Sequence, residues 1–155
     1  MSTGQDREVV LALLHPTEIF GELCLLDGEP GRARVTTLGP TQVIWLPTAH
    51  LAAALARHPE IGLRLLQSTS QRVRAAEGRV RQLAFQDAPE RIEATLRELA
   101  RHRGEQTAAG VVLPRPSQRL VASMVGSTRE TVNRVFKDLE ARDIIRCQGR
   151  EVVVR

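Results

Sequence analysis

Three charged side chains close to the C-terminus have types and spacing that suit directed hydrogen bonding to another molecule. Arg129, Glu130 and Arg134 fall on the polar face of a helix expected from about Thr128 to Glu140. An arginine can donate two hydrogen bonds to O6 and N7 of guanine, and a glutamate can accept one from N4 of cytosine. The first turns of a recognition helix are the part that reaches base edges. The pattern therefore predicts that these three side chains read the bases of double-stranded DNA.

Other polar side chains near this helix are of types that contact the DNA backbone. Lys137 can neutralise a phosphate, and Arg150 lies in a turn between two expected strands, a common place for such contacts. Backbone or accessory contacts are expected from Ser117, Gln118, Thr128, Thr131, Asn133, Lys137 and Arg150. The alternative is that this polar face is only solvated, as it is on many small helical hairpins.

Two capped helices are expected to position these side chains. Ser117 can cap the first, and Gly126 can end it because a left-handed backbone angle costs a glycine little. Ser127 and Glu130 match an S-x-x-E capping box, which predicts the start of the second helix. The apolar positions of that second helix repeat with helical spacing at Val132, Val135, Phe136 and Leu139.

The segments on either side complete a winged helix-turn-helix domain, expected over residues 87–155. Short strands at 144–147 and 152–154, joined by a turn, form the wing. Asp87 begins a capping signal that opens another helix. Residues 104–116 contain glycines, prolines and one short apolar run, so they predict a loop with one small strand.

A long stretch without helix breakers precedes this domain. It begins at Pro59 and continues to about Gln86, so its helix would be about 40 Å long. Its stripe comprises Leu63, Leu66, Ser70, Val73, Glu77, Val80 and Ala84. Such a stripe can face a core or form a two-stranded coiled-coil seam. Because a helix of this length outreaches the core of so small a chain, we expect residues 57–86 to form a dimerisation helix in a homodimer.

Residues 1–56 are expected to form part of a β-sandwich effector domain. Apolar runs at 9–14, 19–26, 33–38 and 43–46 alternate with turn signals, which is typical of short strands. So few strands make an incomplete sandwich, since a sheet hides its apolar face only against a second layer. The chain is therefore expected to begin within a domain and to leave apolar surface exposed.

Composition and motifs exclude several classes of protein. The 155 residues are 42% hydrophobic and 26% charged with a net charge of +4, which fits a globular protein and permits a polyanionic partner. Cys24 and Cys147 are too few for a disulfide framework or a four-thiolate metal site. With no signal-peptide or membrane-span pattern, we expect a cytoplasmic protein that does not bind membranes. The chain also lacks metalloprotease, nucleophile-elbow and phosphate-loop motifs, so we do not expect an enzyme.

Several stretches of the chain resemble the CRP/FNR family of bacterial regulators. Residues 19–30 resemble the family's effector-domain signature, 80–85 the end of its dimerisation helix, and 124–134 its helix-turn-helix. The resemblance implies an α+β fold with a partial cyclic-nucleotide-binding-like β-sandwich, a long dimerisation helix and a winged helix-turn-helix. It also implies a TGTGA-like palindrome as target, with Arg129, Glu130 and Arg134 as base readers, and RNA polymerase as a further candidate partner.

The candidate effector pocket departs from members of that family that bind cyclic AMP. The Arg-Ser pair that grips the cyclic phosphate is replaced by Gly31-Arg32, and the hydroxyl pair on the long helix by Ala76-Glu77. Glu22 matches the carboxylate that contacts the ribose. The candidate pocket residues are Gly21, Glu22, Leu23, Arg32 and Ala33. We therefore expect no cofactor and no control by cyclic AMP, and a second hypothesis is a truncated antagonist that heterodimerises with a full-length relative.

Overall fold

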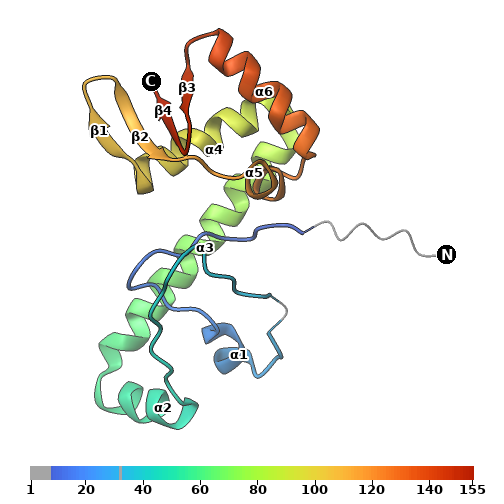
Figure 1. The fold of residues 1–155 in the computed structure, drawn as a ribbon. Coiled ribbons are helices and arrows are strands. Elements are labelled where there is room, and N and C mark those ends of the chain that lie inside the picture. The colour runs from blue at the N-terminus through green and yellow to red at the C-terminus, as the bar shows by residue number, and fades with distance from the viewer. Residues whose placement is uncertain (1–7, 32) are drawn as a thin grey trace, which may run out of the picture. The chain divides into compact units, whose positions relative to one another are not determined.

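The computed structural model describes residues 8–31 and 33–155 and divides into two compact units. The N-terminal unit is Leu14–Arg74, and the C-terminal unit joins the described residues 8–13 with Ala75–Arg155. Figure 1 labels the elements, and helix α3 (Pro59–Phe85) contributes residues to both units. Each unit is described by itself below. The domain limits expected from the sequence, at residues 56 and 86, stay a prediction.

The N-terminal unit is helical where it is regular. It contains α1 (Glu22–Asp27), α2 (Thr48–Arg57) and the first part of α3. The expectation of individual strands at 19–26, 33–38 and 43–46 is wrong, because no described residue of this unit belongs to a strand. The run 9–14, which lies mostly in the other unit, is not a strand either.

The physical reason for this difference is the lack of pairing partners. A strand leaves its backbone N–H and C=O groups unpaired unless a neighbour covers them, whereas a helix pairs them internally. Glu22–Asp27 instead forms a short helix, bounded by Gly21 and Gly28 in the left-handed conformation. The apolar surface expected from an incomplete sandwich is present, since Ile44 is 97% exposed and Trp45 86% exposed.

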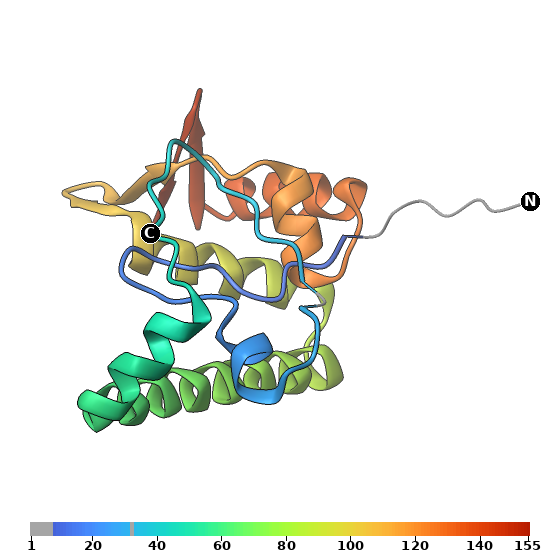
Figure 2. The same cartoon turned by 90° about the horizontal axis from the view of Figure 1, so that it is seen from below.

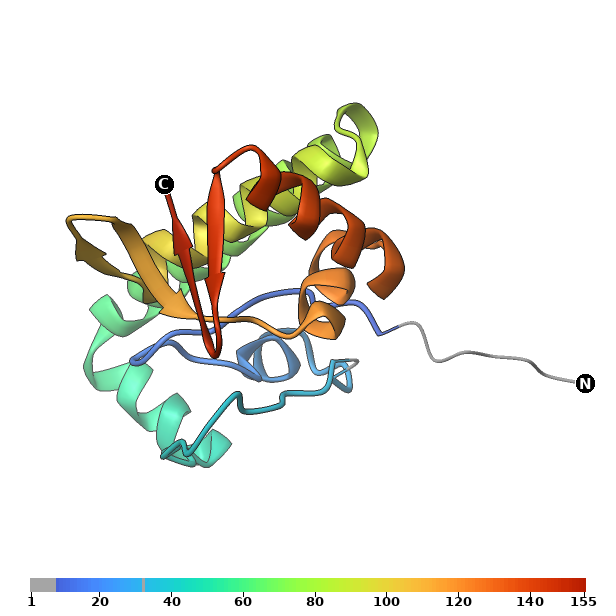
Figure 3. The same cartoon turned by 45° about the horizontal axis from the view of Figure 1, so that its top comes forward.

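The C-terminal unit packs three helices against a small antiparallel sheet. Its further elements are α4 (Ala88–Arg103), β1 (Glu105–Thr107), β2 (Gly110–Pro114), α5 (Gln118–Val125), α6 (Arg129–Ala141), β3 (Ile145–Gln148) and β4 (Glu151–Val154). The strand order is β1-β2-β4-β3, with Val112 opposite Val153 and Cys147 opposite Val152. Figure 2 shows the hairpin of β3 and β4 in red, and Figure 3 shows it beside α6. The wing is thus confirmed as a hairpin.

The region before α5 differs from expectation. The sequence predicted a loop with one small strand over 104–116, but β1 and β2 form a hairpin that extends the sheet of the wing. Pairing of β2 with β4 joins segments that are far apart in the chain, and no local pattern specifies such a pairing. The helix α4 does begin at the expected capping box, because Asp87 accepts a hydrogen bond from Glu90 N–H and the Glu90 side chain accepts one from Asp87 N–H.

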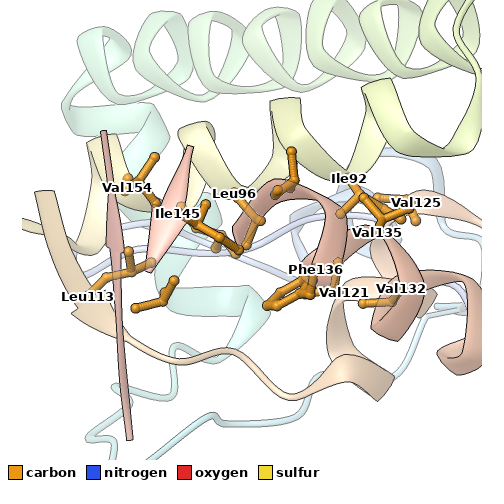
Figure 4. Close-up of a cluster of buried hydrophobic side chains, with 14 of the residues drawn as sticks. Ile92, Leu96, Leu113, Val121, Val125, Val132, Val135, Phe136, Ile145 and Val154 are labelled. Atoms are coloured by element: carbon orange, nitrogen blue, oxygen red, sulfur yellow. The ribbon is translucent and has the colours of Figure 1, made fainter. Parts of the chain in front are cut away.

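One apolar core holds this unit together, and Figure 4 shows its side chains meeting from all three helices and the sheet. Phe136 of α6 is 2% exposed, and Ile92 of α4, Val121 of α5 and Val152 of β4 are all 0% exposed. The apolar positions expected on α6 are therefore the ones that are buried.

Truncation of Phe136 should destabilise this core more than any change on the polar face of α6. For Phe136→Ala we expect a loss of about 3–5 kcal/mol in the free energy of unfolding, because it leaves a cavity. Urea denaturation followed by circular dichroism measures this loss. The neighbouring exposed change Lys137→Ala is the control and should stay within about 0.5 kcal/mol of the parent. Equal losses for the two variants would contradict this account of the core.

Candidate nucleic-acid interface

Helix α5 and the turn after it follow from local backbone requirements. The Ser117 hydroxyl accepts a hydrogen bond from the backbone N–H of Leu120 at 3.1 Å, which caps the first turn. Gly126 ends the helix at φ 64° and ψ 43°, where a residue with a Cβ is strained. The N–H of Ser127 then donates to the carbonyl of Ala122 at 3.0 Å. A short, well-defined turn thus leads into α6.

Helix α6 begins at Arg129, with Thr128 as its N-cap. Thr128 has an extended backbone, and its Oγ1 atom accepts a hydrogen bond from the N–H of Thr131 at 3.2 Å. The predicted capping box of Ser127 and Glu130 is wrong by one residue, because Thr128 is the residue that adopts the N-cap conformation. The predicted start of the helix, at about Thr128, agrees with the structure to within a residue.

The charged face of α6 is exposed while its apolar face is buried. Arg129, Glu130 and Arg134 are all exposed, as is Lys137. Arg134 and Lys137 form no ion pair with any other described residue. Because the core anchors the opposite face, these side chains project away from the protein. The structure therefore brings the three expected base readers together on one accessible surface.

Some of the expected accessory residues make contacts within the protein. The side-chain amide of Gln118 donates to Oδ1 of Asn133 at 3.0 Å, which ties α5 to α6. The hydroxyl groups of Thr128 and Thr131 lie 3.1 Å apart. These contacts fix the helix pair, and a role of the same residues in DNA contact stays a prediction.

The wing turn and the start of α5 border an open hollow. The N–H of Arg115 donates to the carbonyl of Arg150 at 2.8 Å, which joins the segment before α5 to the wing. The lining of the hollow includes Arg115, Ser117, Gln118, Arg119, Arg129 and Arg150. Four arginines so close together create a strongly positive surface that attracts anions.

Two of these arginines, Arg115 and Arg119, are not among the residues that the sequence predicted. They flank the cap residue Ser117. Two cations on either side of an expected helix start are the sequence feature that could have identified them. Arg119 lies 3.6 Å from Glu8, but both side chains are exposed and such a pair contributes little. Both arginines therefore extend the positive surface from α6 toward the wing.

The carboxyl group of Glu130 has a pKa below its ordinary value. Its own backbone N–H donates to the carboxylate, the Thr128 hydroxyl donates as well, and the positive charge of Arg129 adds a smaller effect. At neutral pH Glu130 is therefore an ionised acceptor. Because its pKa is lower in the folded state, its stabilising effect is present above the ordinary pKa and is lost as pH falls through the lowered pKa.

The stripe expected along α3 is uncovered in the single chain. Leu63 is 59% exposed, Leu66 65%, Val73 53% and Val80 66%. The remaining members, Ser70, Glu77 and Ala84, are exposed as well. The apolar members of the stripe are thus available for contact with a second molecule, as a coiled-coil seam requires.

In the candidate effector pocket, Glu22 is already paired. Its buried Oε1 atom accepts a hydrogen bond from the Arg72 guanidinium at 2.5 Å, and Arg72 also donates to the carbonyl of Ile19. Gly21 adjoins Glu22, whereas Leu23 and Ala33 are exposed. Arg32 lies outside the described residues. The assignment of an effector pocket to these residues stays a prediction.

The described chain offers little for other kinds of site. Within residues 8–31 and 33–155, no group of three or more His, Cys, Asp or Glu side chains is arranged to hold a metal ion. In the same ranges, no helix is both long and apolar enough to span a bilayer. Cys24 and Cys147 are free thiols, and burial raises the pKa of Cys147 to about 11, so this thiol is protonated at neutral pH.

Helices α5 and α6 with the hairpin β3–β4 define a winged helix-turn-helix domain. The Crp-like helix-turn-helix domain matches residues 90–155, and the cyclic nucleotide-binding domain matches residues 1–58. A CRP-like cAMP-activated global transcriptional regulator of Mycobacterium tuberculosis is 31% identical over 149 residues, and a global nitrogen regulator of Nostoc is 29% identical over 151. The chain belongs to the CRP/FNR family, which confirms the α+β fold expected from the sequence.

Solved structures agree with this assignment. A CRP/FNR-family transcriptional regulator of Thermus thermophilus matches 63% of this chain with a TM-score of 0.58 and 32% identity. The chain spans 66% of the mycobacterial regulator, 68% of the Nostoc regulator and 50% of the Thermus chain. The alignment with each of these two curated relatives covers 96% of this chain. The family's members are transcription regulators, which supports the expectation that the chain is not an enzyme.

Removal of the Thr128 cap should change both the stability of α6 and the acidity of Glu130. We expect Thr128→Ala to lower the free energy of unfolding by about 1 kcal/mol. The pKa of Glu130 should rise toward its ordinary value, because one hydrogen bond to the carboxylate is lost. Urea denaturation and an NMR pH titration measure the two effects. Thr128→Ser keeps the hydroxyl and should preserve both; a Ser variant that behaved like the Ala variant would disprove the cap.

Proposed function

We propose that this protein is a sequence-specific DNA-binding transcription regulator that acts as a homodimer in the cytoplasm. The observation that carries the proposal is the exposed face of α6, where two arginines and one ionised glutamate project from the capped start of a helix whose other face is buried. A major groove admits one α-helix, and the first turns of that helix reach the base edges. The membership of the CRP/FNR family supports the same function.

The residue types on this face favour a TGTGA-like half-site. Arg129 and Arg134 each offer a bidentate donor for guanine, and Glu130 offers an acceptor for cytosine N4. The arginine-lined hollow and Lys137 provide donors for the phosphates on either side. A homodimer presents this surface twice, so the target is a palindrome of TGTGA and TCACA half-sites about one helical turn apart.

We propose that two chains pair through the exposed stripe of α3. A solvent-exposed row of apolar side chains is costly unless a partner covers it, and an identical helix offers a matching row. RNA polymerase is proposed as a further partner of the DNA-bound dimer.

We also propose that cyclic AMP does not control this protein. The carboxylate of Glu22 is paired with Arg72, and the position expected to hold the phosphate-gripping arginine is Gly31. A pocket without that charge-assisted donor binds a cyclic phosphate weakly. The mycobacterial relative is named as a cAMP-activated regulator, whereas the sequence predicts Gly31-Arg32 in this chain where the phosphate-gripping pair is expected.

Loss of either proposed arginine reader should weaken specific binding more than random binding. We expect Arg129→Ala and Arg134→Ala to lower affinity for the palindrome by about tenfold to a hundredfold, since a bidentate pair discriminates by about 1–3 kcal/mol. Fluorescence anisotropy on the palindrome and on a scrambled duplex measures this difference.

Two controls separate base reading from charge. Arg103→Ala removes the same charge from the end of α4 and should leave the ratio of specific to random affinity unchanged. Lys137→Ala and Arg150→Ala should weaken binding to both duplexes alike. Each should also reduce the slope of log affinity against log salt concentration by about one. If Arg129→Ala and Arg134→Ala weakened the two duplexes equally, the base-reading role would be wrong.

A charge on the α3 stripe should separate the dimer. We expect Val73→Glu to give monomers in sedimentation velocity, because it buries an unpaired carboxylate in the seam. Gln71→Glu introduces the same charge at an exposed position off the stripe and should leave the dimer intact. A parent chain that is monomeric alone but pairs with a full-length CRP/FNR relative would instead support the antagonist hypothesis.

A further inference from the structure

Arg91, in the first half of α4, joins the ends of two other helices. Its Nε atom donates to the carbonyl of Val125 at 3.1 Å, and one terminal nitrogen donates to the carbonyl of Gln86 at 2.6 Å. Val125 is the last residue of α5, and Gln86 follows the last residue of α3. One half-buried guanidinium therefore contacts the C-terminal ends of α3 and α5 together.

These two carbonyls lie at the C-terminal ends of α5 and α3. The last carbonyls of a helix have no partner within the helix, and the helix dipole makes this end negative. A planar guanidinium has several donors in a fixed fork, so it can serve both carbonyls and supply a favourable positive charge. The side-chain oxygen of Gln86 is also buried, with no hydrogen-bond partner among the described residues, so donors are scarce at this junction.

A second contact joins the same two helix ends. Gly126, in the turn between α5 and α6, lies against the last turn of α3, because a Cβ on Gly126 would be 3.7 Å from Cδ2 of Leu83. Such an approach is an ordinary van der Waals contact and constrains direction only loosely. The two hydrogen bonds of Arg91 are directional, so they restrain the last turn of α3 relative to the end of α5 within the C-terminal unit.

We propose that Arg91 is a positioning residue that sets the half-site spacing this regulator accepts. The proposal rests on the proposed function, since α3 carries the dimer stripe and α6 carries the base readers. The angle between α3 and α6 then determines how far apart the two recognition helices lie in the dimer. Arg91 acts on that angle without touching DNA.

The test compares palindromes that differ only in spacing. The parent and Arg91→Met are titrated against a single half-site, a series of TGTGA–TCACA palindromes with spacers that vary by one base pair, and a scrambled duplex. We expect Arg91→Met to bind the half-site within about twofold of the parent. Its affinity for the best-spaced palindrome should fall about tenfold, because both charged hydrogen bonds of Arg91 are lost, and its preference among spacers should flatten.

Two further variants guard the interpretation. Arg97 is another arginine of α4 that pairs with Glu93 and donates to the carbonyl of Arg155. The variant Arg97→Met should keep the parental spacing preference. Arg91→Lys keeps the charge but lacks the fork, so an intermediate preference is expected. If Arg91→Met melts below the assay temperature, Arg91→Lys carries the same test.

Three results would overturn the proposal in distinguishable ways. An equal loss on half-site and palindrome would show that Arg91 only stabilises the domain. An unchanged spacing preference in both Arg91 variants would show that other contacts set the angle. A parent that does not prefer any palindrome over scrambled DNA would remove the proposed function itself, whatever the Arg91 variants do.

Discussion

The packing of one face of α6 against α4, α5 and the sheet is the interaction on which the C-terminal unit depends. A helix of 13 residues is marginal by itself in water, so it forms here because tertiary contacts bury its apolar side. Phe136 and Val132 lie in the core with almost no exposed surface. This burial also fixes the rotation of the helix about its axis, and that rotation directs Arg129 and Arg134 outward.

The ends of the helices provide a second constraint on how α5 and α6 are placed. Hydroxyl caps at Ser117 and Thr128 determine where α5 and α6 begin, and Gly126 provides an unstrained link between them. At the opposite ends, free carbonyls favour cations, and Arg91 meets that requirement for two helices at once. The same positive excess continues on the surface, where the arginines around the hollow attract anions. The helix caps and the arginines on the surface therefore favour the same arrangement, a fixed helix pair beside a positive surface.

The N-terminal unit shows what happens when apolar segments lack partners. Alternating apolar runs have the composition of strands, but a strand is stable only when neighbours pair with its backbone and a second layer covers its face. Ile44 and Trp45 remain exposed, and the segment Glu22–Asp27 is a short helix. The buried carboxylate of Glu22 is compensated by Arg72, which avoids an isolated charge in an apolar setting.

The sequence by itself determined the features that depend on neighbours along the chain. Helical spacing identified the buried face of α6, and the capping box at Asp87 identified the start of α4. The same local rules placed the start of α6 to within one residue, since Ser127 and Thr128 are both good caps and only the backbone conformation selects one. Tertiary structure alone decided the pairing of β2 with β4, the contact of Arg91 with the Val125 carbonyl, and the gathering of Arg115 and Arg119 beside the wing. Each of these joins residues that are distant in sequence. The packing of the whole unit decides which distant groups meet, and no local sequence pattern contains the free energy of that packing.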